Sequence, residues 1–495
     1  MSAPCATLPS VTIVPAPDGE GDPIQPASAP ALRAADLVAA SGGTLIRDAG
    51  RFVRGAAADS RFVEPGNLFV ALPGERTDGH RFLGAAAAAG AAALLVGRAL
   101  DEAEIRALGD VTIVRVPDTL LGLQAIAAAW RARFDPLMVG ITGSLAKTST
   151  KDATAAVLGA ALPTLKSTGN ANNEIGLPIT LLRLGPDHRA AVLEMGMYVG
   201  GEIATLARIA RPEIGVVTSV APVHQERAGS LAAIERAKAE LVEALPPDGT
   251  AVLNADDERV RRFGSRTRAG VIRYGFAADA DVTADRVQGR GRDGMTFDVV
   301  AGAPRRTRFA VEIAALGRHS VQNALAAAAV GLLAGIPDEG IAAGLATGWA
   351  TASAHRGAIV DAPGLTILDD TYNASPPAVL AALEVLRSLP GRPVAVLGEM
   401  LELGDAHAAS HRAVGEAAGA ALAELVVVGD GARGIAEGAL AAGLAPSRIH
   451  AAPDRAEAIE LLRTVLRPGD VVLVKASRGA ALESIVDALR AGITA

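Results

Sequence analysis

The segment GITGSLAKTSTK, at residues 140–151, places a lysine and a threonine where an apolar run turns into a helix-forming stretch. Free backbone N–H groups and the helix dipole attract anions at such a turn. Lys147 suits a phosphate chain, and the Thr148 hydroxyl suits Mg²⁺. The general pattern G-x-x-x-x-G-K-S/T is not met, however, because Ile141 and Ala146 stand where it has glycine. Taken alone, the segment leaves a nucleotide site and a chance string equally open.

The residues around the loop favour the nucleotide site. Gly140 and Gly143 give the turn room, and the buried-looking run Pro136–Val139 precedes it. The Ala146 methyl matters only if its backbone needs a positive φ or if it meets a phosphate directly. Alanine at positive φ costs about 1 kcal/mol or slightly more. We therefore expect a working ATP site whose affinity is weakened several-fold.

The chain as a whole has the composition of a globular protein with several domains. Its 495 residues exceed one hydrophobic core, half of them are apolar and a fifth are charged. A net charge of −7 gives no general reason to bind nucleic acid or anionic lipid. Cys5 is the only cysteine, so a disulfide framework is excluded and a reducing cytosol fits. Without a membrane-length apolar run or a signal-peptide pattern, we predict a cytoplasmic protein.

Periodicity divides the chain into a flexible tail at 1–30 and compact segments at 31–134, 135–350 and 351–495. The first compact segment mixes helices and strands, including strands at 67–72 and 92–96. The second alternates regularly, which predicts a parallel sheet covered on both faces. Its expected strands are 137–142, 190–194, 214–220 and 251–254, and its expected helices are 148–161, 201–210, 230–245 and 323–336.

Two further patterns concern the ends of these sheets. Residues 292–300 alternate between apolar and polar types, which predicts an antiparallel edge strand. The third segment alternates again, with strands expected at 365–368, 394–397, 425–428 and 471–474. Its turn GDGARG, at 429–434, lacks the full dinucleotide fingerprint G-x-G-x-x-G, so we expect it to be a solvent-facing turn.

Several stretches of the chain, in order, resemble the ATP-dependent Mur ligases over roughly residues 35–490. The N-terminal match is DSR followed by PGNLFVALPGERTDGHRF, within 59–82. The other blocks are GSLAKTST (143–150), GNANNEIGLP (169–178), LEMG (193–196), LGRHSVQNALAA (316–327), DDTYNASP (369–376), VLGEMLELG (396–404) and VLVKASRG (472–479). The resemblance implies a three-domain α/β protein with a mixed α/β N-terminal domain, a central P-loop mononucleotide-binding parallel sheet and a Rossmann-like C-terminal domain.

The resemblance also implies a cytoplasmic step of peptidoglycan precursor synthesis. ATP would phosphorylate the terminal carboxylate of UDP-MurNAc-tripeptide, and the amine of D-alanyl-D-alanine would displace the phosphate to give the pentapeptide. One alternative is the family member that adds the third amino acid, but the D-N-P-R motif of its diaminopimelate-type version does not occur in the chain. The other is a catalytically impaired nucleotide-binding relative in which Ala146 has silenced the loop.

The resemblance assigns the catalytic and metal-binding roles to six residues. Lys147 and Arg356 would stabilise charge on the transferred phosphoryl group. Two Mg²⁺ ions would be held by Thr148, Glu194, His224 and Lys238, with Lys238 carrying a CO₂-derived carbamate. Read without the resemblance, Glu194 is a solvated carboxylate, His224 a structural histidine and Lys238 an exposed helical lysine.

The remaining candidate residues belong to ATP and to the two other substrates, and we expect a monomer that binds no nucleic acid. The ATP set is Gly143, Ser144, Leu145, Ala146, Lys147, Thr148, Ser149, Asn254, Asn323, Arg356, Asp370, Tyr372 and Asn373. The UDP-MurNAc-tripeptide set is Ser60, Arg61, Asp78, Gly79, His80, Asn172, Asn173 and Glu174. Lys475, Ser477 and Arg478 would face the D-alanyl-D-alanine carboxylate. His319 and Ser375 are left unassigned, because the block around each departs from the family pattern.

Overall fold

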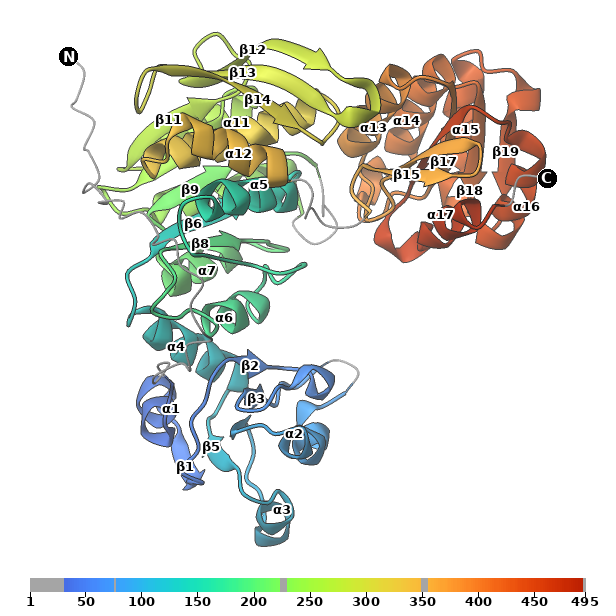
Figure 1. The fold of residues 1–495 in the computed structure, drawn as a ribbon. Helices are drawn as coiled ribbons and strands as arrows, with labels where there is room; N and C mark the ends of the chain where they lie inside the picture. The colour runs from blue at the N-terminus through green and yellow to red at the C-terminus, as the bar shows by residue number, and fades with distance from the viewer. Residues whose placement is uncertain (1–30, 75–76, 223–228, 349–354, 493–495) are drawn as a thin grey trace, which may run out of the picture.

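The computed structural model describes residues 31–74, 77–222, 229–348 and 355–492. Three sheets, each with its own helices, follow one another along the chain, and Figure 1 shows them as three bodies coloured blue, green to yellow, and orange to red. The predicted three-domain α/β class is confirmed. None of the described helices combines the length and the apolar composition that crossing a bilayer requires.

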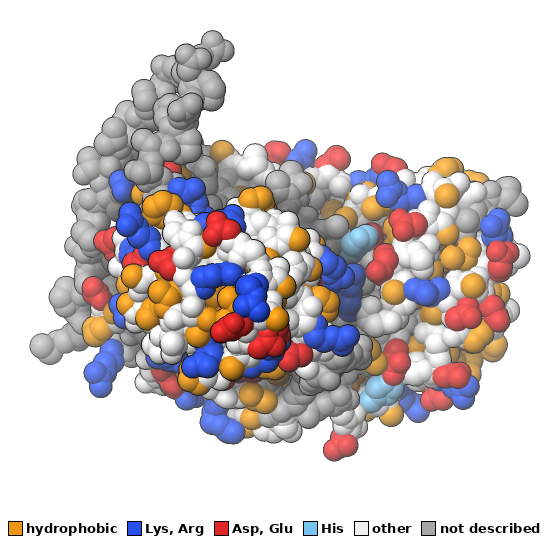
Figure 2. Space-filling model, turned by 90° about the horizontal axis from the view of Figure 1, so that it is seen from below, with side chains coloured by type: hydrophobic (Ala, Val, Ile, Leu, Met, Phe, Trp, Pro, Cys, Tyr) orange, Lys and Arg blue, Asp and Glu red, His pale blue; other side chains and the backbone are white. Residues whose placement is uncertain are grey.

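The N-terminal sheet has five strands, parallel except where its first strand pairs antiparallel with β5. In spatial order they are β1 (Thr44–Arg47), β5 (Thr112–Arg115), β4 (Ala93–Val96), β3 (Leu68–Val70) and β2 (Ala56–Ala57). Its helices are α1 (Ala34–Ser41), α2 (Leu83–Ala88), α3 (Glu102–Ala107) and α4 (Thr119–Arg131). Viewed from this end, basic and acidic side chains are interspersed over the surface (Figure 2).

Helix α4 fixes the N-terminal domain to the central one. Its Trp130 indole N–H donates to Leu184 O at 3.0 Å, and Arg131 Nε donates to Ala210 O at 2.8 Å. One continuous cluster of buried apolar side chains runs from the N-terminal domain through α4 into the central domain. Because buried packing resists hinge motion, these two domains should move as one unit.

The central sheet has nine strands, of which the seven from β7 to β12 are parallel. In spatial order the strands are β14 (Thr307–Ile313), β13 (Met295–Ala301), β12 (Val282–Gly289), β11 (Gly270–Tyr274), β10 (Thr250–Asn254), β9 (Ile214–Val217), β6 (Leu137–Thr142), β8 (Ala190–Glu194) and β7 (Thr164–Lys166). The strands predicted at 137–142 and 190–194 are confirmed at those bounds, because short apolar runs between turn residues are strong strand signals.

Helices cover both faces of the central sheet, as its pattern predicted. One face packs against α5 (Lys147–Gly159), α11 (Arg318–Leu333) and α12 (Asp338–Gly348). The other face packs against α6 (Gly176–Leu181), α7 (Glu202–Ala210) and α9 (Leu231–Glu243), and the short α10 (Glu258–Arg261) follows β10.

Two predictions for this region were partly wrong. The strand predicted at 292–300 is antiparallel, as β13, but it is not an edge, because β12 and β14 flank it. Alternation of apolar and polar residues indicates that one face of a strand is less buried than the other. It does not indicate whether another strand pairs with its edge. The helix predicted to begin at 323 begins at Arg318, since its polar first turn shows no apolar periodicity.

The C-terminal sheet has six strands, and only the edge pair β15–β16 is antiparallel. In spatial order they are β15 (Ala358–Ala362), β16 (Leu365–Asp369), β20 (Asp470–Lys475), β17 (Arg392–Gly398), β18 (Glu424–Val428) and β19 (Ile449–Ala452). One face carries α13 (Pro376–Ser388), α14 (His407–Ala421) and α15 (Arg433–Ala441), and the other carries α16 (Arg455–Val465) and α17 (Glu483–Arg490).

Several contacts between described residues join the central and C-terminal domains. Leu316, just before α11, packs into the apolar cluster of the C-terminal domain. At Gly317 (φ +82°), a Cβ would lie 2.7 Å from Val385 Cγ2 of α13, so the two domains meet where only glycine fits. Arg292, in the turn between β12 and β13, forms an ion pair with Asp361 of β15.

Candidate nucleotide site

A cavity of about 900 Å³ lies between the central and C-terminal domains. It opens at the carboxyl ends of β6, β8, β9 and β11, which is where doubly wound sheets bind ligands. Its walls include the loop between β6 and α5, the N-terminal half of α11, the residues that precede and begin β15, and the segment that follows β16.

The loop between β6 and α5 is braced by the residues that follow β9. Ser144 N donates to Ser219 O at 2.8 Å, and Leu145 N donates to the Ser219 hydroxyl at 2.9 Å. A Cβ at Gly143 (φ +150°) would lie 1.8 Å from Thr218 Oγ1, so glycine is required there. The loop therefore has one tightly specified backbone path.

Ala146 adopts the left-handed backbone conformation, with φ 63° and ψ 5°. This is the condition under which alanine in place of glycine carries a cost. The residue immediately precedes α5, whose first residues Lys147 and Thr148 line the cavity, and the N-terminus of a helix attracts anions.

Lys147, the first residue of α5, curls back over the loop. Its Nζ donates to Gly143 O at 2.7 Å and to Ser144 O at 3.3 Å. Desolvation in the cleft lowers the pKa of Lys147, the Arg356 guanidinium lowers it further, and Glu194 opposes both. The Lys147 ammonium group thus lies at the loop, near Arg356 and Glu194, which were also predicted to act on the phosphates of ATP or on their Mg²⁺.

Glu194 ends β8 with its side chain buried beside the loop. Its Oε1 accepts a hydrogen bond from Asn172 Nδ2 at 2.8 Å. Its Oε2 is buried and has no hydrogen-bond partner among the described residues. A buried carboxylate oxygen without a partner requires an explanation, and a hard cation is a fitting one.

Thr148 is buried on the cavity wall next to Glu194, so the donor set for a cation combines a hydroxyl and a carboxylate. Within the described ranges, no three His, Cys, Asp or Glu side chains converge to hold a metal by themselves. Mg²⁺ usually takes one or two protein carboxylates or hydroxyls together with phosphate oxygens and waters. The residues present therefore fit Mg²⁺ bound with a nucleotide.

Lys238 of α9 is buried at 2% exposure, so the alternative of an exposed helical lysine is wrong. Desolvation holds its pKa well below 10.5, Lys147 lowers it further, and Glu194 and Glu202 oppose the shift. Helical periodicity could not reveal this burial, because it depends on how α7, β6 and β9 pack against α9. His224 lies outside the described residues.

The two asparagines predicted near the nucleotide differ in their access to the cavity. Asn254 is buried, and its Nδ2 donates to Thr218 O at 2.7 Å, so it holds β9 to β10. Asn323 of α11 lines the cavity, and the Thr150 hydroxyl approaches its Oδ1 at 3.5 Å. Ser149 also lines the cavity.

Arg356 enters the cavity from the C-terminal domain and lies over the ring of Tyr372, with Cζ 3.6 Å from the ring centroid. Its Nε is buried without a partner among the described residues. Asp370 and Asn373 line the same wall. Stacking on Tyr372 holds the guanidinium at the cavity, close enough to Lys147 to lower its pKa, and a planar donor of this kind suits phosphate oxygens.

Of the three residues predicted for D-alanyl-D-alanine, only Lys475 lines the cavity. Its buried Nζ donates to Asp370 Oδ2 at 2.5 Å and to Asn373 O at 2.8 Å. The Ser477 hydroxyl accepts from Leu401 N at 2.9 Å. Arg478 is mostly exposed and pairs with Glu483 at 3.4 Å.

The residues predicted for the muramoyl peptide lie between α6 and the cavity. Asn172, Asn173 and Glu174 all line it. Asn172 binds Glu194, whereas Asn173 Oδ1 accepts the N–H of Gly176 at 2.9 Å and so begins α6. Asn172 thus both lines the cavity and contacts the Glu194 carboxylate.

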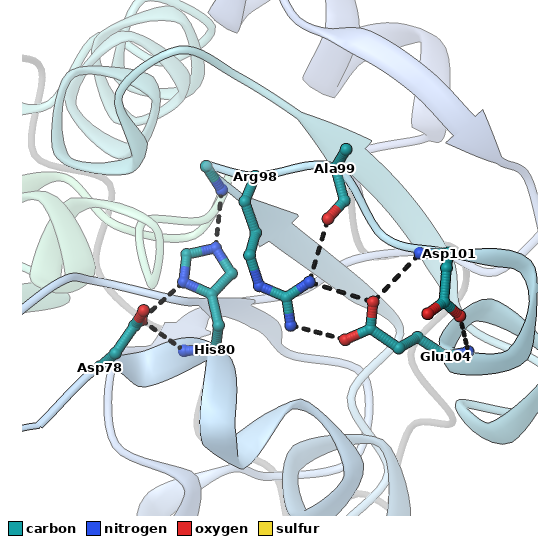
Figure 3. A network of polar contacts seen from close by, with 7 residues as sticks. Asp78, His80, Arg98, Ala99, Asp101 and Glu104 are labelled. Carbon is teal, nitrogen blue, oxygen red and sulfur yellow. Dashed lines mark hydrogen bonds and ion pairs between the residues drawn. The ribbon is translucent and has the colours of Figure 1, made fainter.

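The residues predicted for the uridine diphosphate lie in the N-terminal domain, outside this cavity. His80 bridges two loops, because its Nδ1 lies 2.6 Å from Asp78 Oδ1 and its Nε2 accepts the N–H of Gly97 at 2.8 Å (Figure 3). Asp78 also accepts the N–H of His80 and begins the 3₁₀ turn containing Gly79. Arg61, next to Ser60, pairs with Asp59, and its hydrogen bonds lower the pKa of Asp59 to about 2.

Several cavity residues were not predicted from the sequence. Thr218 and Ser219 follow β9 directly, so their place at the end of a predicted strand was a usable signal. No such signal marked three other residues of the cavity wall. Arg292 lies in a hairpin turn, Tyr274 ends a strand that was not predicted, and Gln322 occupies an ordinary helical position.

Comparison with known proteins agrees with this architecture. The family models described as Mur ligase family, catalytic domain, Mur ligase middle domain, and Mur ligase, glutamate ligase domain match residues 53–131, 141–331 and 355–478. The chain is 39% identical to the UDP-N-acetylmuramoyl-tripeptide–D-alanyl-D-alanine ligase of Escherichia coli, over 87% of this chain and 92% of that one. It is also 39% identical to the ligase of the same name from Mycobacterium tuberculosis, over 88% and 92%.

Solved structures are similar over most of the chain. A crystal structure of MurF from Acinetobacter baumannii superimposes with a TM-score of 0.81 at 28% identity, covering 94% of this chain and 99% of that one. The MurF ligase of Thermotoga maritima in complex with ADP gives a TM-score of 0.77 at 27% identity, covering 89% and 98%. With its three matched domains and its nucleotide-sized interdomain cavity, this chain belongs to the Mur ligase family.

Proposed function

We propose that this ATP-dependent ligase joins D-alanyl-D-alanine to UDP-MurNAc-tripeptide, giving UDP-MurNAc-pentapeptide, ADP and phosphate in the cytoplasm. The observation that carries the proposal is the cavity, whose wall includes Lys147, Glu194 and Arg356 from two domains, with the last two close enough to shift the pKa of Lys147. Full-length relatives with this activity in their names support the choice of substrates.

The chemistry follows from the poor reactivity of a carboxylate toward an amine. The terminal peptide carboxylate attacks the γ-phosphorus of ATP, and the bond from that phosphorus to the ADP oxygen breaks. The amine nitrogen of D-alanyl-D-alanine then attacks the acyl carbon, the carbon–oxygen bond to phosphate breaks, and the nitrogen loses a proton. Atoms and charge balance with phosphate as the leaving group.

Each side chain at the cavity has a part in the phosphoryl transfer. Lys147 and the N–H groups that begin α5 bind phosphate oxygens from the central domain, and Arg356 binds them from the C-terminal domain. Thr148 and Glu194 would hold Mg²⁺, which neutralises the charge of the phosphates. Closing the two domains on the cavity excludes water that would hydrolyse the acyl phosphate.

We include a carbamate on Lys238 in this proposal. Burial lowers the pKa of Lys238 and so favours its neutral amine, and a neutral amine can add to CO₂ with loss of one proton. The nearby Lys147 ammonium would offset the charge of the carbamate. Together with His224, this group would serve a second Mg²⁺.

The other substrates are assigned by domain. The N-terminal domain would bind the uridine diphosphate end with Ser60, Arg61 and the segment 78–80. Lys475 would serve D-alanyl-D-alanine within the cavity, supported by its place on the wall. We divide the chain at 134 and 350 and propose that it acts as a monomer.

The test is a reaction of purified protein with Mg²⁺, ATP, UDP-MurNAc-tripeptide and D-alanyl-D-alanine, followed by mass spectrometry. We expect UDP-MurNAc-pentapeptide and one ADP per product. Product formed only from UDP-MurNAc-dipeptide and a free amino acid would assign the enzyme to the preceding step. ATP binding without ADP release, with all substrates present, would identify an impaired relative.

A further inference from the structure

Arg356 lies in a turn whose backbone is unusual on both sides of it. The residue before it, His355, has φ 67°, and the residue after it, Gly357, has φ 70°. Glycine adopts positive φ readily, whereas a residue with a Cβ is disfavoured there unless its surroundings hold it. The turn therefore depends on contacts that keep His355 in this conformation.

Two hydrogen bonds connect His355 to the segment at the end of β16. Its Nδ1 lies 2.7 Å from Asp369 Oδ2, and because a carboxylate accepts, the imidazole donates. Its carbonyl oxygen accepts the N–H of Tyr372 at 3.0 Å. The side chain and the backbone of His355 thus bind the two ends of the segment 369–372.

Asp369 is a well-held partner for the His355 imidazole. It ends β16, is buried at 3% exposure, and pairs in register with Ala358, the first residue of β15. Its other oxygen, Oδ1, accepts from the Thr371 hydroxyl at 2.7 Å and from Thr371 N at 3.2 Å. A carboxylate fixed by packing and by its own hydrogen bonds can fix the side chain that it binds.

The same segment carries the ring on which Arg356 lies. Tyr372 is bound through its N–H to His355, and Arg356 Cζ is 3.6 Å from the Tyr372 ring centroid. Arg356 Nε is buried and has no hydrogen-bond partner among the described residues. The place of the guanidinium in the cavity therefore depends on the ring beside it and on the backbone turn that carries it.

We propose that His355 is a positioning residue for phosphoryl transfer, because its bond to Asp369 holds the turn that keeps Arg356 on Tyr372 at the cavity. Arg356 lines the cavity, whereas His355 is not among the residues of the cavity wall, so it acts through its neighbour. The inference rests on the proposed function in one respect, that Arg356 binds the phosphoryl group transferred from ATP.

The loss of the imidazole should affect turnover more than folding. The His355 side chain is 37% exposed, so water can bind Asp369 Oδ2 once the imidazole is removed. Water at this place cannot hold the backbone turn, because it has no covalent link to Arg356. Displacing a charge-stabilising group by about 1 Å can lower a rate about a hundredfold, so a small shift of the turn is enough to be measured.

The experiment measures ADP release by the full-length protein with Mg²⁺, ATP, UDP-MurNAc-tripeptide and D-alanyl-D-alanine. His355→Ala and His355→Gly both remove the imidazole, and the glycine variant also relieves the strain of positive φ, so it should fold. We expect both to lower kcat about tenfold and to leave the KM for D-alanyl-D-alanine within about twofold, because the lost effect is on transferred charge. His355→Asn should keep kcat within about threefold, since its amide nitrogen can replace Nδ1 and asparagine tolerates positive φ.

A double-mutant cycle with Arg356→Ala separates positioning from general structural support. Because His355 acts through Arg356, His355→Gly should lower kcat by less than about twofold further in a protein that already lacks Arg356. His450→Ala is the matched control, since His450 Nε2 lies 3.0 Å from Glu424 Oε2 in the same domain and neither residue lines the cavity. It should leave kcat unchanged. Thermal melts of all variants check that they fold.

The outcomes separate this inference from the proposed function. An unchanged kcat in folded His355→Gly overturns the inference alone, and so does a full tenfold further loss in the protein that lacks Arg356. If Arg356→Ala has no measurable turnover, an equal loss in His355→Asn and His355→Gly overturns the inference instead. ADP release that depends on His355 but yields no pentapeptide overturns only the proposed function. If the unaltered protein releases no ADP, both fail.

Discussion

Replacing Ala146 with glycine should stabilise the free protein and change its ATP affinity little. Ala146 has φ 63° and ψ 5°. A residue with a Cβ in this region is disfavoured by about 1–2 kcal/mol, and glycine relieves that strain. Glycine also gives the unfolded chain more freedom, which opposes the gain by about 0.5–1 kcal/mol. The expected net increase in the free energy of unfolding is about 0.5–1 kcal/mol.

The same structure predicts the effect on ATP. Strain at Ala146 lowers folding stability, and it changes ATP affinity only if the backbone at this residue differs between the free and the bound protein; we expect the left-handed conformation in both. Ala146→Gly should therefore shift the ATP dissociation constant by less than about threefold, because differential stabilisation is needed to change affinity. The weakened affinity expected from the sequence would require a loop that becomes strained only on binding.

Two other alanines provide controls for this reasoning. Ala160, at the other end of α5, has φ −66°, so Ala160→Gly should lower stability by about 0.5–1 kcal/mol. Ala481 in the C-terminal domain has φ 49°, so Ala481→Gly should raise it. Thermal melting would show these changes as shifts of about 1–4 °C for domains of this size. Calorimetric titration with ATP and Mg²⁺ measures the ATP dissociation constant of each variant.

Two results would refute the reasoning. An Ala146→Gly protein that melts at or below the wild-type temperature, while Ala481→Gly melts above it, would show that the loop carries no strain. A tightening of ATP by more than about tenfold would show that the strain arises on binding. The second result would also revive the view that the native loop is defective.

Three further predictions concern the cavity. Glu194→Gln should abolish the Mg²⁺-dependent part of ATP affinity while leaving the thermal stability of the free protein nearly unchanged; equal Mg²⁺ dependence in calorimetry would contradict the cation site. Lys238→Met should have a larger free energy of unfolding than the wild type at pH 7 in CO₂-free buffer, and this difference should shrink toward pH 10. Between the lowered pKa of Lys238 in the folded protein and 10.5, only the unfolded chain binds this proton, so the stability of the wild type rises with pH. A difference that stays constant with pH in urea unfolding would reject this prediction. Tyr372→Leu should weaken ATP binding several-fold through loss of the 3.6 Å stack on Arg356, whereas Tyr372→Phe should retain it; equal loss in both would assign the effect to the hydroxyl group.

Some of the fold was predictable because the local signals were strong. The strands that became β6 and β8 are mostly apolar runs that end within two residues of a glycine, and their bounds agree with the prediction. The antiparallel extension β12–β14 was largely missed, since its strands are half exposed and contain many charged residues. Short, two-sided polar strands differ little from loops in sequence.

The site was predictable in its components and less so in its contacts. Residue type and position after a strand singled out Lys147, Thr148 and Glu194. The same reasoning could not indicate that Asn172 would hold Glu194, or that Lys475 would pair with Asp370, because these partners are distant in sequence. Such pairs depend on how the helices and strands pack.

The amino-acid sequence alone determined the alternation of strands and helices, the phosphate loop and the resemblance to the Mur ligases. These features depend on interactions within one element or one turn, so they can be read locally. The tertiary structure decided that Lys238 is buried, that Ala146 is left-handed and that Glu194 keeps a buried oxygen without a partner among the described residues. Burial, backbone strain and the lack of a hydrogen-bond partner depend on atoms contributed by other elements, and only folding brings those atoms together.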